Sequence, residues 1–131
     1  MPFLRVSLHK GRTPAQIRAL IDAVYQALHR SFEVPAGDRF AVVHQHEAGE
    51  FFYDVSYLGM QRTDDLVFIQ IFAGKVRSVE TKREFYRDVC ESLASVCGLS
   101  RDDVFVSIST NAGEDWSFGR GDAQLIESRA R

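Results

Sequence analysis

The chain begins with Met1-Pro2-Phe3-Leu4-Arg5-Val6-Ser7-Leu8, and the architecture of the protein is arranged around these residues. Their apolar side chains predict a buried strand, so the chain is expected to start inside the fold. Because Pro2 has a small side chain, Met1 is expected to be removed, which leaves a free secondary amine. An ordered amine in an apolar setting can act as a base, an acid or a nucleophile. Pro2 is therefore the first candidate for a catalytic residue.

Composition bounds the class of protein. The sequence has 131 residues, 45% of them hydrophobic and 26% charged, which predicts one globular domain with a real core. A net charge of −2 gives no indication of a nucleic acid or an anionic membrane as partner. No apolar run reaches membrane length, and no leader is recognised, so a cytoplasmic location is expected.

The two cysteines, Cys90 and Cys97, lie seven residues apart in a helical pattern. This spacing separates them by about two turns on one helix face, which is too far for a disulfide. They are interpreted as core thiols of a reducing compartment, and no metal site is predicted.

The first half of the chain reads as strand, helix, strand. After the opening strand, Thr13 can cap a helix, Pro14 suits its first position and Gln16 completes a capping box. Apolar residues follow at helical spacing until Phe32. Residues 39–46 then read as a second strand.

The second half repeats this order. Residues 65–72 predict a strand covered on both faces, because they show almost no polar alternation. Ser78 can cap a second helix, Gly98 can end it, and residues 104–109 predict the last strand. Between the halves, residues 47–64 are too aromatic for a solvated linker; they are expected to form an extra hairpin or to cover a partner's surface.

We therefore predict one α+β domain, residues 1–131, built from duplicated βαβ units. The units span about 2–46 and 65–109, joined by the connection 47–64 and followed by a C-terminal tail, 110–131. Right-handed crossovers place both helices on one face of a four-stranded mixed sheet. The other face would be bare and apolar, so an oligomer with a shared, barrel-like core is expected.

Two cations follow the buried strand of the second half. Lys75 and Arg77 alternate around Val76, which in extended chain directs them to the same side, near the N-terminus of the second helix. They are candidates for binding a carboxylate, and the alternative is a solvated basic turn. A cation near the Pro2 amine would also lower the pKa of that amine.

Other polar residues give weaker indications. Asp38 precedes the second strand, where it is either a turn residue or a group that orients a water or the amine. His44 and His46 share one side of a strand, but they lack further ligands and make a poor metal site. His29 could activate a water, although an exposed helix histidine is the simpler interpretation.

The segment Asp115-Trp116-Ser117-Phe118-Gly119-Arg120-Gly121 contains the only tryptophan. Trp116 and Phe118 could form a dry wall over a small substrate, could be buried at a subunit interface, or could do both. The flanking glycines permit a tight backbone path.

Taken together, the sequence resembles the tautomerase superfamily, whose members use an N-terminal proline on duplicated βαβ units, and within it the malonate semialdehyde decarboxylases. The resemblance covers nearly the whole chain. It rests on Pro2, Gly11-Arg12-Thr13, Val34-Pro35-Ala36 with Asp38-Arg39, Val43-His44-Gln45-His46, Lys75 to Ser78, and Asp115 to Gly121.

The resemblance implies a homotrimer that decarboxylates malonate semialdehyde, a small carboxylate, without metal or organic cofactor, and that hydrates acetylenic acids. By position, Pro2 is the cationic proline, Asp38 its partner acid and Arg77 the carboxylate-binding arginine. Trp116 and Phe118 match the apolar wall. Lys75 stands where the family often has a second arginine, and lysine lacks the bidentate fork, so the orientation of the carboxylate or the substrate itself could differ.

Two alternatives stay open at this point. One is a tautomerase of enol-pyruvates, or a hydratase or dehalogenase of unsaturated acids, on the same scaffold. The other is a non-catalytic trimeric binding protein, for which the aromatic connection 47–64 is the only support.

Overall fold

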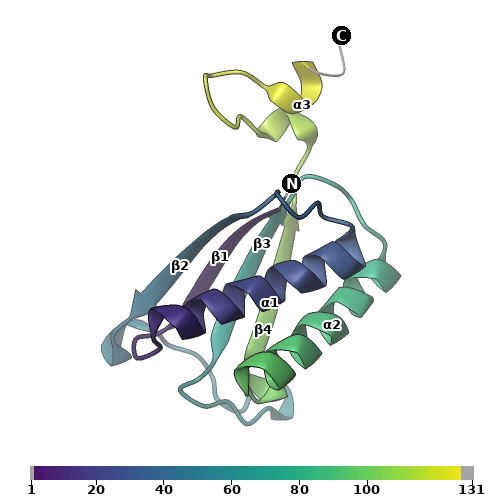
Figure 1. Ribbon diagram of the computed structural model, residues 1–131. Helices are drawn as coiled ribbons and strands as arrows, with labels where there is room; N and C mark the ends of the chain where they lie inside the picture. Colours follow the sequence, from purple (N-terminus) through teal and green to yellow (C-terminus); the bar gives the residue numbers. More distant parts are fainter. Residues whose placement is uncertain (1, 128–131) are drawn as a thin grey trace.

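The computed structural model describes residues 2–127 and contains one four-stranded sheet with two long helices (Figure 1). The first half gives β1 (Pro2–His9), α1 (Pro14–Phe32) and β2 (Phe40–His46). The second gives β3 (Val67–Ala73), α2 (Val79–Cys97) and β4 (Val104–Thr110), and a short α3 (Gln124–Glu127) follows. Figure 1 shows α1 and α2 side by side on the same face of the sheet.

The sheet order is β2-β1-β3-β4. Strands are parallel within each half (β1 with β2, β3 with β4) and antiparallel where the halves meet at β1 and β3. The predicted four-stranded mixed sheet with two helices on one face is therefore confirmed. Relative to the predicted bounds, β2 begins one residue later and β3 runs from residue 67 to 73.

Local sequence signals set the helix ends. The hydroxyl of Thr13 accepts from the backbone N–H of Gln16, whose side chain in turn accepts from the N–H of Thr13. Ser78 caps α2 by accepting from Thr81, and Gly98 ends it in the left-handed region, with φ of 68°.

The core lies between the sheet and the two helices. Alternate residues of the central strands point toward the helices, and those of the helix stripes point back at the sheet. The fully buried members include Leu4, Val6, Leu8, Leu20, Val24, Leu28, Val67, Ile69, Ile71, Phe85, Val89 and Leu93.

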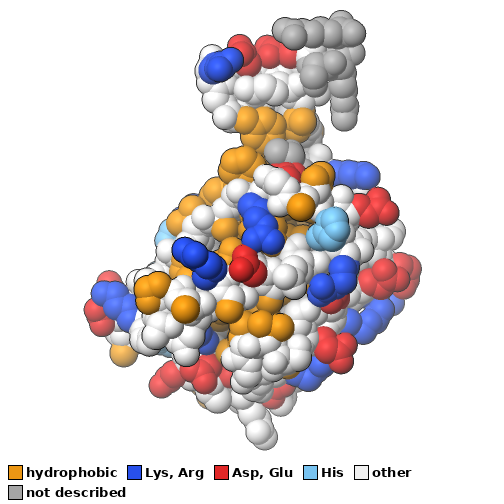
Figure 2. All heavy atoms as spheres, viewed as in Figure 1, with side chains coloured by type: hydrophobic (Ala, Val, Ile, Leu, Met, Phe, Trp, Pro, Cys, Tyr) orange, Lys and Arg blue, Asp and Glu red, His pale blue; other side chains and the backbone are white. Residues whose placement is uncertain are grey.

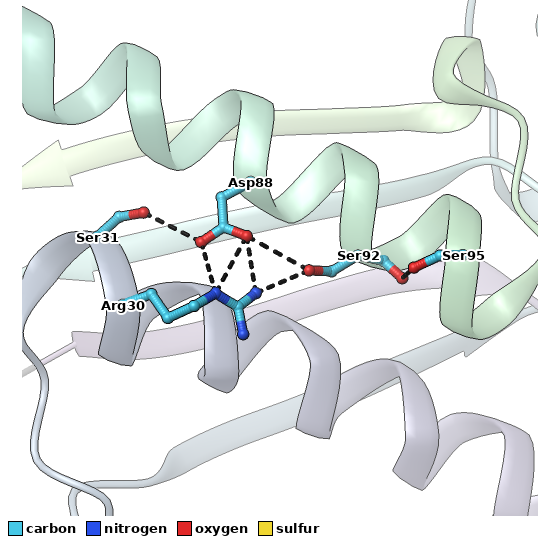
Figure 3. A network of polar contacts seen from close by, with 5 residues as sticks. All are labelled: Arg30, Ser31, Asp88, Ser92 and Ser95. Atoms are coloured by element: carbon cyan, nitrogen blue, oxygen red, sulfur yellow. Dashed lines mark hydrogen bonds and ion pairs between the residues drawn. The ribbon is translucent and has the colours of Figure 1, made fainter.

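A polar network joins the two helices at their exposed side (Figure 3). The guanidinium of Arg30 donates to Asp88 through Nε at 3.0 Å and Nη2 at 2.7 Å, and Nη2 also donates to Ser92. Ser31 adds a hydroxyl donor to the same carboxylate. Because the contact is bidentate and joined to two hydroxyls, it fixes the relative position of α1 and α2 better than a single exposed ion pair would.

Asp88→Asn is therefore expected to lower the free energy of unfolding by about 1 kcal/mol, with a smaller loss at high salt. Urea unfolding at low and high ionic strength measures this. The control is Asp22→Asn, which removes a single exposed contact with Arg39 and should cost less than about 0.5 kcal/mol. Equal losses in the two variants would contradict the importance given to the network.

The opposite face of the sheet is partly covered by the connection between the halves. Residues 47–64 form two short 3-10 turns, Ala48–Glu50 and Tyr57–Gly59, and no strand. Phe51 is buried, with its ring centroid 4.9 Å from those of His9 and Phe68. The connection thus covers one end of its own sheet, and the expected hairpin is not formed. Because Phe52 and Leu58 of the connection are exposed, a contact with a partner's surface stays a prediction.

The rest of this face stays open in the single chain. Phe40, Val42 and Phe105 are 48%, 41% and 39% exposed. Within residues 2–127, no helix is both long enough and apolar enough to span a bilayer.

Candidate active site

The strand directions bring four chain segments to one edge of the sheet. β1 and β2 begin at this edge, whereas β3 and β4 end there, because the halves are antiparallel. The edge therefore collects Pro2, the turn before β2, the turn after β3 and the start of the tail. All six residues predicted for the site, Pro2, Asp38, Lys75, Arg77, Trp116 and Phe118, belong to these segments.

Pro2 is buried and forms the first residue of β1. Its partner across the sheet is Ala73, the last residue of β3. On its other side, Phe3 pairs with Phe40. The proline is thus held between the turn that carries Asp38 and the turn that carries Lys75 and Arg77.

Asp38 is also buried, with 8% of its surface exposed. Its backbone N–H donates to the carbonyl of Pro35, which closes the turn before β2. Burial raises the pKa of the Asp38 carboxyl, and the positive charge of the amino terminus opposes this by a smaller amount. A carboxyl in this setting can exchange a proton closer to neutrality than a solvated aspartate.

The raised pKa of Asp38 predicts a pH dependence of stability. Since folding favours the protonated form, the contribution is complete below the unfolded pKa of about 4 and is lost as the pH rises through the folded pKa. Asp38→Asn removes this titration. Its free energy of unfolding should therefore fall less than that of the wild type between pH 4 and pH 7 in urea titrations.

Asp54 provides a control of opposite sign for this measurement. Hydrogen bonds from Ser56 lower the pKa of Asp54, so its contribution is lost as the pH falls through the folded pKa. Asp54→Asn should therefore leave the loss between pH 4 and pH 7 at least as large as in the wild type. Parallel curves for wild type and Asp38→Asn would show that Asp38 does not titrate as described.

Arg77 is half-buried and held in a fixed orientation. Its guanidinium lies 4.3 Å from the centroid of the Phe32 ring, Nη2–H donates to the Phe32 carbonyl at 3.2 Å and Nη1–H donates to the Lys75 carbonyl at 3.1 Å. Burial lowers the pKa of Arg77, and Glu33 opposes this. A guanidinium has five N–H donors, so this one retains donors for a carboxylate.

Lys75 differs from Arg77 in its setting. Its side chain is exposed, and its backbone carbonyl supports the arginine. The ordered cation of this turn is therefore Arg77.

The aromatic pair of the tail lies at the same edge. Trp116 is half-buried, its indole Nε1–H donates to Asn111 Oδ1 at 2.8 Å, and its ring stacks on Phe118 with centroids 5.7 Å apart. Figure 2 shows hydrophobic side chains gathered where the tail meets the body of the molecule. Gly119 and Gly121 both have positive φ, at 141° and 75°, as the tight path after the pair requires.

The histidines lie outside this edge or serve other contacts. His29 is exposed, and its Nδ1 lies 2.8 Å from the Val34 carbonyl, a contact in which that nitrogen donates. The rings of His44 and His46 stack on the open face of the sheet, 6.5 Å apart. Residues 2–127 contain no group of three or more His, Cys, Asp or Glu suited to a metal ion. Cys90 and Cys97 are free thiols whose pKa is raised by burial.

Three residues at this edge were not singled out by the sequence: Phe32, Gly74 and Asn111. Phe32 supports Arg77 with its ring and carbonyl. Gly74 and Asn111 both contact Trp116. The contacts of Phe32 with Arg77 and of Gly74 with Trp116 join residues more than 40 positions apart, so no local spacing could have indicated them. Asn111 lies only five residues before Trp116, but nothing in that short spacing identifies an indole acceptor.

A large cavity of about 1050 Å³ lies at the opposite edge, near the end of β1 and the start of β3. Its lining includes His9, Arg12, Phe51 and Asp65, and none of the six predicted site residues. At the edge that carries Pro2, Lys75 and Phe118 are exposed in the single chain, whereas Pro2 and Asp38 are buried.

Comparison with known proteins shows which family the chain resembles. Two family models described as tautomerase enzyme match residues 38–119 and 2–60. The probable tautomerases YusQ and YrdN of Bacillus subtilis (strain 168) are 39% and 37% identical, over 97% and 98% of this chain and 100% and 99% of their own lengths.

The solved structures agree. A crystal structure of malonate semialdehyde decarboxylase, from work on its decarboxylase and hydratase activities, is 39% identical with a TM-score of 0.91, covering 97% of this chain and 98% of the other. A second malonate semialdehyde decarboxylase, inhibited by 3-bromopropiolate, is 37% identical with a TM-score of 0.89, covering 97% and 96%. A fused 4-OT symmetric trimer, at 21% identity and a TM-score of 0.76, covering 95% and 98%, shares the fold.

Proposed function

Because the chain belongs to the tautomerase family, we propose that it is a cofactor-independent decarboxylase of a small 3-oxo acid of the malonate semialdehyde type. The observation that carries the proposal is the meeting, at one sheet edge, of the strand that begins with Pro2, the ordered guanidinium of Arg77 and the Trp116–Phe118 pair. The similarity to two malonate semialdehyde decarboxylases supports the choice of substrate class.

In this proposal Arg77 binds the substrate carboxylate. A guanidinium can donate two parallel hydrogen bonds to the two oxygens of a carboxylate. The carbonyls of Lys75 and Phe32 and the Phe32 ring restrict the movement of this guanidinium. When the carboxylate is held out of the plane of the aldehyde group, the C1–C2 bond overlaps the π system of the carbonyl and is aligned for cleavage. Positioning of this kind lowers the barrier to C1–C2 cleavage and does not only raise the affinity for the substrate.

Pro2 acts at the aldehyde. After removal of Met1, the cationic amine can donate a hydrogen bond to the carbonyl oxygen. Alternatively, the amine first gives its proton to Asp38 and attacks the carbonyl carbon, and the carbinolamine then loses its hydroxyl as water, with the returned proton, to form an iminium. The C1–C2 bond then breaks, CO₂ leaves, and the electron pair moves into the enol or enamine. Protonation at C2, with hydrolysis in the iminium case, gives acetaldehyde and restores the amine. Borohydride trapping of a covalent adduct distinguishes the two routes.

The remaining residues set the environment of this step. Asp38, buried at the start of β2, is the partner acid that holds or returns the proton of the amine. Trp116 and Phe118 exclude water where negative charge disappears as CO₂, since an apolar wall favours the neutral product over the charged carboxylate. No step requires a metal or an organic cofactor.

Acetaldehyde release from malonate semialdehyde tests the proposal. Coupled reduction of the product follows turnover in purified protein, with Pro2→Ala as the matched control. Turnover well above the control supports the proposal. The same rate in wild type and control removes it and leaves the non-catalytic binding protein as the better interpretation.

A second function is favoured by the names of the curated relatives, which are probable tautomerases. The same amine and cation could ketonise an enol-pyruvate or add water to an unsaturated acid. Phenylenolpyruvate ketonisation and 2-oxo-3-pentynoate hydration measure these activities. Rates above that of malonate semialdehyde decarboxylation would make this the main function.

We further propose a homotrimer in the cytoplasm, with the open sheet face and the Pro2 edge covered by neighbouring subunits. The exposed Phe40, Val42 and Phe105 and the open site support this. Sedimentation equilibrium should give about three times the chain mass of 14.8 kDa. A stable monomer of full activity would contradict it.

A further inference from the structure

We propose that Asn111 is a positioning residue that holds the Trp116 indole against Gly74. It thereby fixes the position of the Trp116–Phe118 pair at the sheet edge that carries Pro2. The catalytic consequence rests on the proposed function, whereas the placement of the indole does not. The inference therefore has one readout that depends on turnover and another that is independent of it.

Asn111 connects the sheet to the tail. Its backbone N–H donates to the carbonyl of Ala73 at 2.9 Å, directly after the paired residues Ala73 and Thr110. Its side-chain Oδ1 accepts from the indole Nε1–H of Trp116 at 2.8 Å. Because Ala73 is also the strand partner of Pro2, one residue links the indole to the strand end that faces the amine.

Gly74 provides the surface on which the indole rests. A Cβ added to Gly74 would lie 3.0 Å from Trp116 Nε1 and 3.5 and 3.6 Å from Cε2 and Cδ1. A Cβ contact of 3.0 Å is tighter than nine in ten real ones, so an alanine here would push the indole away by a few tenths of an ångström. Glycine is needed here for the close approach of an aromatic ring, not for an unusual backbone conformation.

Several other contacts of the tail join its own residues to one another. Figure 1 shows the segment after β4 standing away from the sheet and helices. Within it, Asp115 accepts from the N–H of Ala112, and Gln124 binds the backbone of Phe118 and Gly119. These contacts shape the tail internally, whereas the Asn111 side chain ties the Trp116 ring to the end of β4.

An indole fixed in this way is in place before substrate binds. It limits the space above Gly74 to a short acid, and it needs no ordering during the reaction. Loosening the ring should therefore affect the reacting complex more than initial binding. This predicts a change in kcat with little change in KM.

Trp116 is the only tryptophan of the chain, so its fluorescence reports the indole directly. The test compares Asn111→Leu, which removes the acceptor, with Asn111→Asp, which keeps one, and Gly74→Ala with Gly49→Ala. Gly49 is the matched control because a Cβ there meets nothing within 4 Å. Circular dichroism and urea unfolding establish that each variant is folded.

The indole of Trp116 is either packed against Gly74 or displaced from it. We expect Asn111→Leu to lower the ratio of packed to displaced indole about fivefold, because the variant loses the hydrogen bond from Trp116 Nε1–H. Acrylamide quenching should rise in Asn111→Leu and Gly74→Ala and stay at the wild-type level in Asn111→Asp and Gly49→Ala. In the decarboxylase assay, kcat of Asn111→Leu and Gly74→Ala should fall by up to about fivefold, with KM changed less than about twofold.

The outcomes separate the two proposals. Changed quenching in a protein without decarboxylase activity would refute the proposed function and retain the placement of the indole. Unchanged quenching in folded Asn111→Leu and Gly74→Ala would overturn the inference, whatever the activity. Changed quenching with normal kcat in an active enzyme would overturn the catalytic role of the placement.

Discussion

The Pro2→Ala variant is expected to decarboxylate malonate semialdehyde about 1000-fold more slowly than the wild type. Alanine keeps an amine, but it loses the ring that fixes the backbone and fills the buried start of β1. The amine is then less well held against the substrate carbonyl. Steady-state kinetics with folded variant protein measure the loss, which should fall mainly on kcat.

A chain that retains Met1 tests the same amine without changing Pro2. In that chain the nitrogen of Pro2 is part of a peptide bond, whose resonance removes its basicity. Such a sample should be inactive although its fold is unchanged, so intact mass must be measured beside activity. A fully active Met1-containing sample would exclude Pro2 as the reacting amine.

Replacing Arg77 is expected to have the second largest effect. Arg77→Met should lower kcat/KM about 100-fold, corresponding to about 3 kcal/mol, because the substrate carboxylate loses its hydrogen-bonded charge partner. Arg77→Lys should recover only part of this, because an ammonium cannot give two parallel hydrogen bonds or stack as the guanidinium does on Phe32.

Lys75→Met is the matched comparison for Arg77→Met. It removes a cation two residues away whose side chain is exposed, so the loss in kcat/KM should be less than about fivefold at physiological salt. Equal losses in the two variants would mean that Lys75 completes the binding site for the carboxylate. A loss with Lys75→Met alone would contradict the role given to Arg77.

The fold was largely predictable because its signals are local. The capping box of Thr13 and Gln16, the Ser78 cap and the Gly98 end are all present in the structure. The course of residues 47–64 was not predictable. Phe51 of this connection packs on His9 and Phe68 of two different strands, and such a contact has no periodic signature in the sequence.

The candidate site was predictable in its polar residues and less so in what holds them. Pro2 and Arg77 were singled out because their residue types suit acid–base chemistry and anion binding at strand ends, and Asp38 was added through the family resemblance; their roles stay a prediction. Gly74 and Asn111 were missed because a glycine after a strand and an asparagine before a turn are common. Their importance follows only from the position of the Trp116 ring.

The pseudo-symmetry of the two halves has a consequence for how many active centres one chain can hold. The start of β3 corresponds to the start of β1, and it lies at the opposite edge, beside the large cavity that Asp65 lines. There the backbone nitrogen is an amide, because it is internal to the polypeptide. The starts of β1 and β3 are therefore equivalent in the two βαβ units, but only the start of β1 can carry a basic amine. Under the proposed function, the location at the start of β3 lacks the basic amine and is left for a structural or recognition role.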